Sequence, residues 1–144
     1  MKFEDIFSEW EKDSDIDRTE IGNESLKIPK LHYKYYRVFC DERIRLRNYE
    51  SQLKTLRLQK YEFYTQGPDE ETRSKGWKLP SKGLILKSDI PMYMEADQDM
   101  IDISLKIGLQ QEKVELLENI IKSLNNRGYL LKTCLDWARF TMGS

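Results

Sequence analysis

Two stretches of the chain place apolar residues at alternating intervals of three and four, the pattern of long packed helices. The first, residues 29–66, would form a helix roughly 57 Å long. Its seam residues are Leu46, Tyr49, Leu53, Leu56 and Phe63, and Lys60 takes the position that interrupts the series. The second, residues 98–139, keeps a regular seam from Met100 to Ala138. The pattern predicts an all-α protein whose two long helices form an antiparallel, coiled-coil-like hairpin.

The second helix carries more apolar surface than one neighbouring helix can cover. Such surface commonly marks association, and head-to-tail contacts between subunits can close into rings. We therefore expect a ring-like homo-oligomer held by seam residues Leu117, Ile121, Leu124, Leu131 and Leu135. The run Asn125-Asn126-Arg127-Gly128 could break this helix, but the unbroken seam favours a kink or a close backbone approach over a full turn.

The remaining segments complete a single helical domain over residues 1–144. Residues 3–13 have Phe3, Ile6 and Trp10 on one face and acids on the other, which predicts a short amphipathic helix. Such a helix either packs on its own subunit or serves as a docking handle. Ser25 is a candidate cap for the long helix that follows, with Pro29 in its first turn. A connection over 67–88 and a C-terminal helical region over 89–142 finish the chain.

Charge is distributed unevenly behind a net charge of −1. Residues 27–60 hold ten basic and three acidic residues, whereas residues 1–24 hold nine acidic and three basic ones. Basic residues interleaved with aromatic rings are typical of single-strand nucleic-acid binding. The DNA-binding candidates are Arg43, Arg47, Lys54, Arg57, Lys60, Tyr61 and Tyr64. The basic face could instead pair with the acidic N-terminal segment, and both roles can hold together.

Trp77 lies in the connection among Lys75, Lys78, Lys82 and Lys87. It either anchors this segment or belongs to a DNA-contacting loop, and we favour the anchor.

Catalytic, metal and cofactor motifs are missing from the sequence. There is no P-loop, and His32 is the only histidine. Cys40 and Cys134 form no CxxC pair, which indicates reduced thiols. The acids from Asp13 to Glu24 resemble a calcium loop, but Arg18 stands where that loop needs glycine. We expect no enzyme activity and no cofactor. A structural coiled-coil adaptor without nucleic-acid binding is the alternative function.

Three segments resemble the UvsY family of phage recombination mediators, in versions from T-even-like phages of cyanobacteria. The segments are LQKYEFYTQG (58–67), KSDIPMYMEADQDMIDISLKIG (87–108) and ENIIKSLNNRGYLLKTCLDWARFTMG (118–143). The resemblance implies single-stranded DNA binding and loading of the phage recombinase onto strands covered by single-strand-binding protein, in homologous recombination and repair. It further implies ring-like homo-oligomers of the hexamer or heptamer kind, assembled partly through a C-terminal helix. No run of apolar residues approaches the roughly 18 needed to span a bilayer, so we expect no membrane partner. The implied place of action is the cytoplasm of the infected bacterial host.

The resemblance also assigns DNA contact to a Lys-x-Arg pair that precedes an acidic, aromatic and Tyr run. The Arg position falls on Lys60, and the Lys position falls on Leu58. Arg57, the residue before Leu58, could take the place of this Lys. A shift of one residue, however, rotates the side chain by about 100° around the helix.

Overall fold

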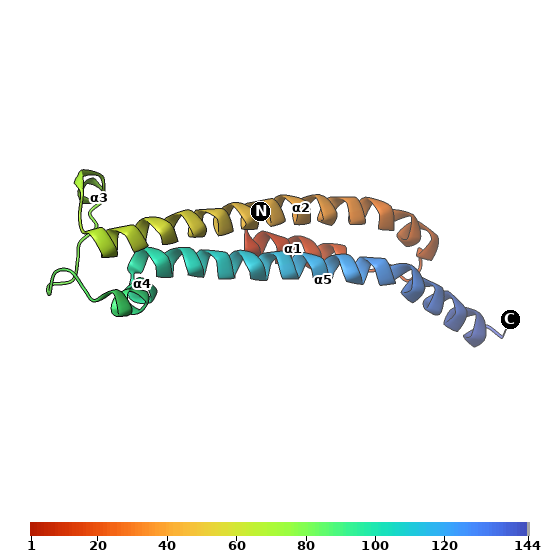
Figure 1. Ribbon diagram of the computed structural model, residues 1–144. Coiled ribbons are helices and arrows are strands. Elements are labelled where there is room, and N and C mark those ends of the chain that lie inside the picture. The colour runs from red at the N-terminus through yellow and green to blue at the C-terminus, as the bar shows by residue number, and fades with distance from the viewer. Residues whose placement is uncertain (144) are drawn as a thin grey trace. The chain divides into compact units, whose positions relative to one another are not determined.

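The computed structural model describes residues 1–143, which fold mainly into helices. The helices are α1 (Phe3–Asp13), α2 (Ile21–Gln66), α3 (Glu70–Ser74), α4 (Ile90–Ala96) and α5 (Gln98–Thr141), with a 3-10 turn at Lys87–Asp89 (Figure 1). The described residues contain no strand, so the predicted all-α class is confirmed. None of these helices has the length and apolar character needed to cross a membrane.

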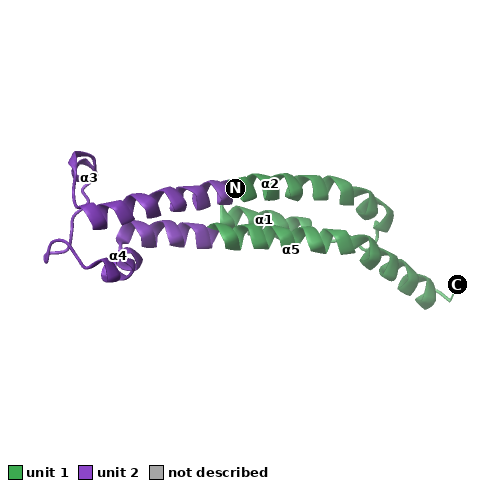
Figure 2. Cartoon of the chain, viewed as in Figure 1, with its two compact units in different colours: residues 1–44, 110–144 green, residues 45–109 purple. Residues whose placement is uncertain are grey.

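The chain divides into two compact units, coloured separately in Figure 2. The first unit combines residues 1–44 with the chain from residue 110 onward, and the second is Arg45–Leu109. Both α2 and α5 therefore contribute one segment to each unit. Within each unit these two segments pack side by side and run antiparallel, as predicted for the hairpin.

The first unit is a three-helix arrangement in which α1 packs on α2 and α5. Its core holds Ile6 of α1, Tyr35 of α2, and Leu117, Ile120 and Leu124 of α5. Ile6, Leu117 and Leu124 have no exposed surface. The short helix over residues 3–13 thus packs on its own subunit, which decides between the two roles that the sequence allowed.

Polar contacts at the end of α1 fix its position on α2. Lys34 pairs with Glu9 at 2.7 Å and with Asp13 at 2.6 Å, and the Tyr35 hydroxyl donates a hydrogen bond to Asp13 at 2.7 Å. Burial alone would raise the pKa of Asp13, but the hydrogen bonds from Lys34 and Tyr35 outweigh burial and hold this pKa below its ordinary value. Arg127 of α5 donates to the Asp13 backbone carbonyl at 2.8 Å. An acidic amphipathic helix is therefore docked on the α2/α5 pair through apolar anchors and two basic residues, Lys34 of α2 and Arg127 of α5.

The second unit is built around the last turns of α2. Phe63, Tyr64 and Ile90 form its buried core, and Trp77 packs edge-on against Phe63 with ring centres 5.6 Å apart. Trp77 therefore anchors the connection, in agreement with the favoured interpretation. Asp69 caps α3 through a reciprocal pair of hydrogen bonds with Thr72, which gives this charged segment local order.

Two details of the long helices differ from, or refine, the sequence prediction. α2 begins at Ile21, not near Pro29, so Pro29 lies inside the helix and Ser25 is not its cap. The proline removes one backbone hydrogen bond near the N-terminal end of α2. In the first turn of the helix, Glu24 is buried and pairs with Lys27 at 3.0 Å. α5 remains helical through Gly128, so there is no turn. Outside the neighbouring turns of α5 itself, no atom of the described residues lies within 4 Å of the place where a Gly128 Cβ would stand, so no close approach requires glycine.

Candidate nucleic-acid interface

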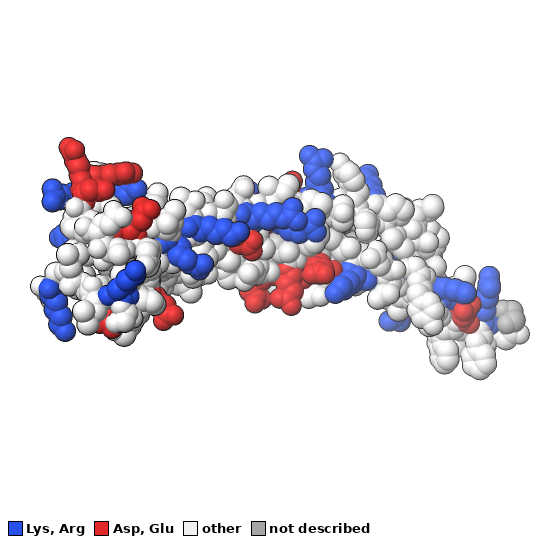
Figure 3. Space-filling model, viewed as in Figure 1, with Lys and Arg blue, Asp and Glu red and all other residues white. Residues whose placement is uncertain are grey.

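Four of the predicted DNA-binding residues occupy exposed positions on the α2 segment of the second unit. They are Arg47, Lys54, Arg57 and Tyr61, and we call them the basic face. Their intervals of seven, three and four residues return each side chain to the same side of the helix. Figure 3 shows basic side chains gathered over α2 on the visible side. The basic face thus offers three cations and one ring from a single rigid element.

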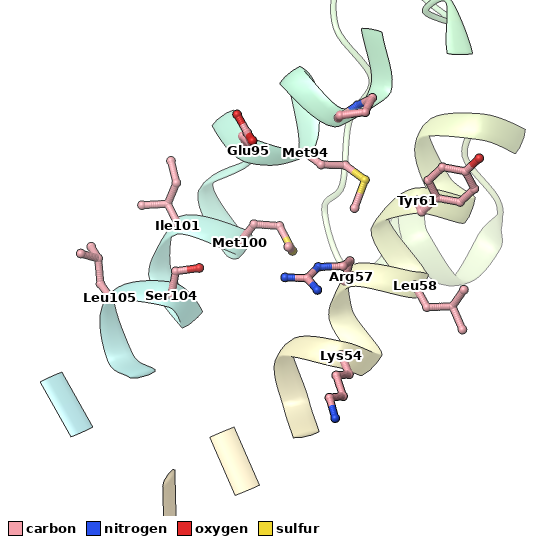
Figure 4. A pocket seen from close by; sticks show the side chains of 11 residues that line it. Lys54, Arg57, Leu58, Tyr61, Met94, Glu95, Met100, Ile101, Ser104 and Leu105 are labelled. Carbon is pink, nitrogen blue, oxygen red and sulfur yellow. The ribbon is translucent and has the colours of Figure 1, made fainter. Parts of the chain in front are cut away.

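The basic side chains of this face are free of ion pairs within the described part of the chain. Tyr61 is 40% exposed, so part of this residue is accessible to a stacking partner. Figure 4 shows Lys54, Arg57 and Tyr61 projecting from α2. Arg43 is also exposed, but it belongs to the first unit, where its guanidinium lies 5.2 Å from the Phe39 ring centre.

Lys60 is not on the basic face, because its side chain is turned into the second unit and is 4% exposed. Its Nζ atom lies 2.8 Å from Asp99, 3.1 Å from Asp97 and 3.8 Å from the centre of the Trp77 ring. A buried ammonium group that is paired in this way has no free surface for a phosphate. The prediction that Lys60 contacts DNA is therefore not supported. In this chain the position that corresponds to the Arg of the family's Lys-x-Arg pair is buried and offers DNA no free surface.

Tyr64 is withdrawn for the same reason. Its residue is 6% exposed, and its hydroxyl donates a hydrogen bond to Asp97 at 2.7 Å. Burial and this hydrogen bond raise the pKa of Tyr64 above its ordinary value. The ring contributes to the core beside Phe63, with ring centres 5.3 Å apart, and presents no open side to a base.

Asp97 joins these side chains to the start of α5. One of its carboxylate oxygens accepts backbone N–H bonds from Asp99 and Met100, which satisfies donors at the first turn of α5. The other oxygen accepts from Tyr64 and pairs with Lys60. Burial opposes ionisation of Asp97, but the hydrogen bonds from Tyr64, Lys60 and Met100 outweigh it and keep the pKa of this carboxyl below its ordinary value. The cluster of Lys60, Tyr64, Trp77 and Asp97 is therefore structural.

The predicted oligomerisation residues divide in the same way between buried and exposed positions. Leu117 and Leu124 are fully buried in the core of the first unit, and Leu131 is 2% exposed, so these three support the subunit itself. Ile121 packs partly against that core, and Leu135 is 36% exposed. The sequence prediction therefore named several residues that are already covered within one chain.

The sequence analysis missed the exposed apolar residues near the end of α5. Trp137 is 66% exposed and Phe140 is 74% exposed, and their rings stack with centres 5.7 Å apart. Tyr129 and Leu130 are also largely exposed. By helix geometry these positions lie on the side of α5 that faces away from its seam. The apolar residues on that side were the signal that could have identified them.

The fold and the exposed basic face define an all-α protein with a candidate nucleic-acid surface on one long helix. The family model described as "Recombination, repair and ssDNA binding protein UvsY" matches residues 9–144. The chain belongs to this family, so its functions lie in recombination, repair and single-stranded DNA binding. This confirms the resemblance to the UvsY family found in the sequence.

Solved structures of a relative show the same fold. Two crystal structures of the bacteriophage T4 recombination mediator protein UvsY, of lattice types II and IV, match with TM-scores of 0.83 and 0.80. Their sequence identities are 19% and 18%, and the matches cover 99% and 98% of this chain and 98% and 99% of those chains. No curated protein sequence matches the chain.

Proposed function

We propose that this protein is a recombination mediator that holds single-stranded DNA on the basic face of α2. In this role it promotes loading of the phage recombinase onto strands covered by single-strand-binding protein, inside the infected host cell, with no catalytic step of its own. The observation that carries the proposal is the exposed basic face, and the chain belongs to a family described as binding single-stranded DNA. Arg47, Lys54 and Arg57 are exposed on one side of a rigid helix, and none has an acidic partner in the described chain.

Each residue type on the basic face has a defined task. Arg47, Lys54 and Arg57 neutralise phosphates, which releases counterions and makes affinity depend steeply on salt. Tyr61 offers its ring to an unstacked base, a contact worth about 1–3 kcal/mol. Neither contact reads base identity, so the expected binding tolerates any sequence. Arg43, which belongs to the first unit, is a separate candidate for phosphate contact.

We also propose that the protein works as a ring-like homo-oligomer of the hexamer or heptamer kind. The exposed apolar residues at the end of α5, above all Trp137 and Phe140, are the best candidates for the subunit contact. A ring presents one basic face per subunit to the same strand. Repeated presentation raises the effective concentration and can increase avidity about 10²–10⁴-fold without any new contact.

The test compares two double charge reversals of equal size. Lys54→Glu with Arg57→Glu changes the basic face, and Lys78→Glu with Lys82→Glu changes exposed lysines of the connection. In fluorescence anisotropy with an oligo-dT strand, the first variant should lose at least about tenfold in affinity and show a weaker salt dependence. The second should stay near the wild type, and both should melt like the wild type by circular dichroism.

Other outcomes would change the assignment. Equal losses in both variants would mean that general attraction, and not a defined face, holds the strand. A loss only in the connection variant would move DNA contact to the loop around Trp77. Absence of wild-type binding at both low and moderate salt would favour the alternative, a coiled-coil adaptor without nucleic acid.

A further inference from the structure

An open groove lies between the α2 and α4–α5 segments of the second unit. It has a volume of about 890 Å³, and most of its surface is apolar. Figure 4 shows Met94 and Met100 converging on its centre, with Leu58 projecting from α2 and Leu105 from α5. Leu58 is 59% exposed and Leu105 is 68% exposed, so these two leucines lack a covering partner in the described chain.

The first unit shows how the same two helices bind a third. There α1 packs on α2 and α5 by placing Ile6 and Trp10 into their apolar surface. Its acids Glu9 and Asp13 pair with Lys34, a basic residue of α2. In the first unit, therefore, the antiparallel pair of α2 and α5 binds an acidic amphipathic helix through an apolar surface and a basic residue beside it.

The groove of the second unit has the same two ingredients. Its apolar floor includes two methionines, whose flexible side chains adapt to different partners. Lys54 and Arg57 stand one turn apart at its α2 edge, unpaired within the described residues, and Glu95 is the one acid among the lining side chains. The charge at the α2 edge therefore favours acidic side chains on whatever lies in the groove, since opposite charges improve orientation and association rate.

We propose that this groove is a docking site for a short acidic amphipathic helix of a partner protein. Its apolar residues, spaced at three and four, would lie against Met94, Met100, Leu58 and Leu105, the usual mode of helix-in-groove recognition. Its acids would pair with Lys54 and Arg57. These two residues also belong to the basic face, so a DNA strand and a docked helix compete for them.

The probe is a hydrocarbon-stapled, fluorescent peptide with the sequence of residues 2–14, KFEDIFSEWEKDS, which is itself such a helix. Stapling is needed because three turns alone are marginally helical in water. A matched peptide carries lysine in place of every acid. Binding to the full-length protein is measured by anisotropy without DNA, and we expect saturable binding of the acidic peptide and at least about tenfold weaker binding of the basic one.

Two protein variants locate the binding. Leu58→Glu with Leu105→Glu places charge on the groove and should weaken peptide binding at least about tenfold, because it removes apolar contact and repels the acids. Leu109→Glu is the control, because Leu109 is 61% exposed on the same helix but does not line the groove. It should bind the peptide like the wild type. All three substituted leucines are exposed, so folding should be preserved.

Three results would overturn the proposal. The first is no saturable binding of the acidic peptide up to about 1 mM. The second is binding that the groove variant does not weaken, which would mean that the peptide replaces α1 in the first unit. The third is a fall in oligomer mass for the groove variant by light scattering with the control unchanged, which would show that another copy of this chain covers the groove.

Discussion

Lys60 and Arg57 lie three residues apart on α2 and have opposite surroundings. Arg57 is exposed, whereas Lys60 is enclosed by Asp97, Asp99 and the Trp77 ring. Removing one partner of a buried ion pair leaves the other charge buried and uncompensated, which is strongly destabilising. Removing an exposed, unpaired charge costs little. The two side chains should therefore respond differently to the same substitution.

We predict that Lys60→Ala lowers the free energy of unfolding by about 3 kcal/mol. Arg57→Ala should change it by less than about 0.5 kcal/mol while it weakens DNA binding. Urea denaturation followed by circular dichroism, at one fixed protein concentration, measures both changes in stability. If Lys60→Ala were as stable as Arg57→Ala, the ion pairs seen in the structure would contribute nothing to folding.

The sequence alone partly indicated that Lys60 is buried and Arg57 is exposed. Lys60 occupies a seam position between Leu56 and Phe63, and a seam residue points toward the neighbouring helix whatever its chemistry. Its charge and the family motif nevertheless favoured DNA contact. Its acidic partners could not be predicted, because Asp97 and Asp99 come close only after the connection has folded back on α2.

Among the helices, α5 depends on Asp97 for its first turn. This carboxylate accepts from the N–H groups of Asp99 and Met100, and it also holds Lys60 and Tyr64. Its pKa is depressed in the folded protein. A depressed pKa contributes stability that is fully present above the unfolded value of 3.8 and disappears as the pH falls through the lower folded value.

We predict that acid weakens the wild type partly through Asp97. Between pH 5 and the region below pH 3.8, the free energy of unfolding should fall less in Asp97→Asn than in the wild type, because the variant has no carboxylate to protonate. Asp97→Asn should also be the less stable protein at pH 7. Denaturation series at several pH values test this, and parallel pH dependence in both proteins would contradict it.

The connection between α2 and α4 is ordered mainly through Trp77. Its ring contacts Phe63 and lies over Lys60, while nearby Lys78 and Lys82 are exposed to a protease. We predict that Trp77→Ala speeds tryptic cleavage in this segment several-fold, because local opening becomes less costly. Leu86→Ala is the control, since Leu86 is 71% exposed. Equal cleavage of both variants would mean that Trp77 does not hold the segment.

The sequence predicted the long helices well and their ends less well. The seams identified α2 and α5 because interval patterns of three and four depend only on local geometry. Pro29 misled the placement of the α2 start, since a proline is common in a first turn, whereas here it lies inside the helix, where it removes a hydrogen bond. The α3 turn was missed because its capping residues Asp69 and Thr72 lie in a segment without apolar periodicity.

For the molecule as a whole, the question is which apolar residues a subunit buries in its own core and which it leaves exposed for contact with another subunit. The seam pattern alone cannot do this, because Leu117 and Leu124 follow the same spacing as Leu135 yet are covered by α1 and α2. Only the docked position of α1 shows which part of the apolar surface on α5 is already used. The exposed pair Trp137 and Phe140 then becomes the candidate for contact between subunits.

We predict that Trp137→Asp with Phe140→Asp reduces the oligomer mass and leaves the helical content unchanged. A charge at an exposed contact blocks association, whereas a charge in the core opposes folding. Leu124→Asp should accordingly lose helical signal. Light scattering and circular dichroism make the comparison. An unchanged mass in the Trp137 and Phe140 variant would remove the end of α5 from the proposed interface.

The same variant separates contact from avidity in DNA binding. The wild type should gain affinity as oligo-dT lengthens from a strand that reaches one basic face to a strand that reaches several, because later contacts become intramolecular. The Trp137→Asp, Phe140→Asp variant should bind the short strand like the wild type, since Lys54 and Arg57 are unchanged. It should lose most of the gain on the long strand, about 10²-fold or more. Anisotropy titrations with both strands at one salt concentration measure this. A full length-dependent gain in the dissociated variant would show that one subunit binds the whole strand and that the ring adds nothing to affinity.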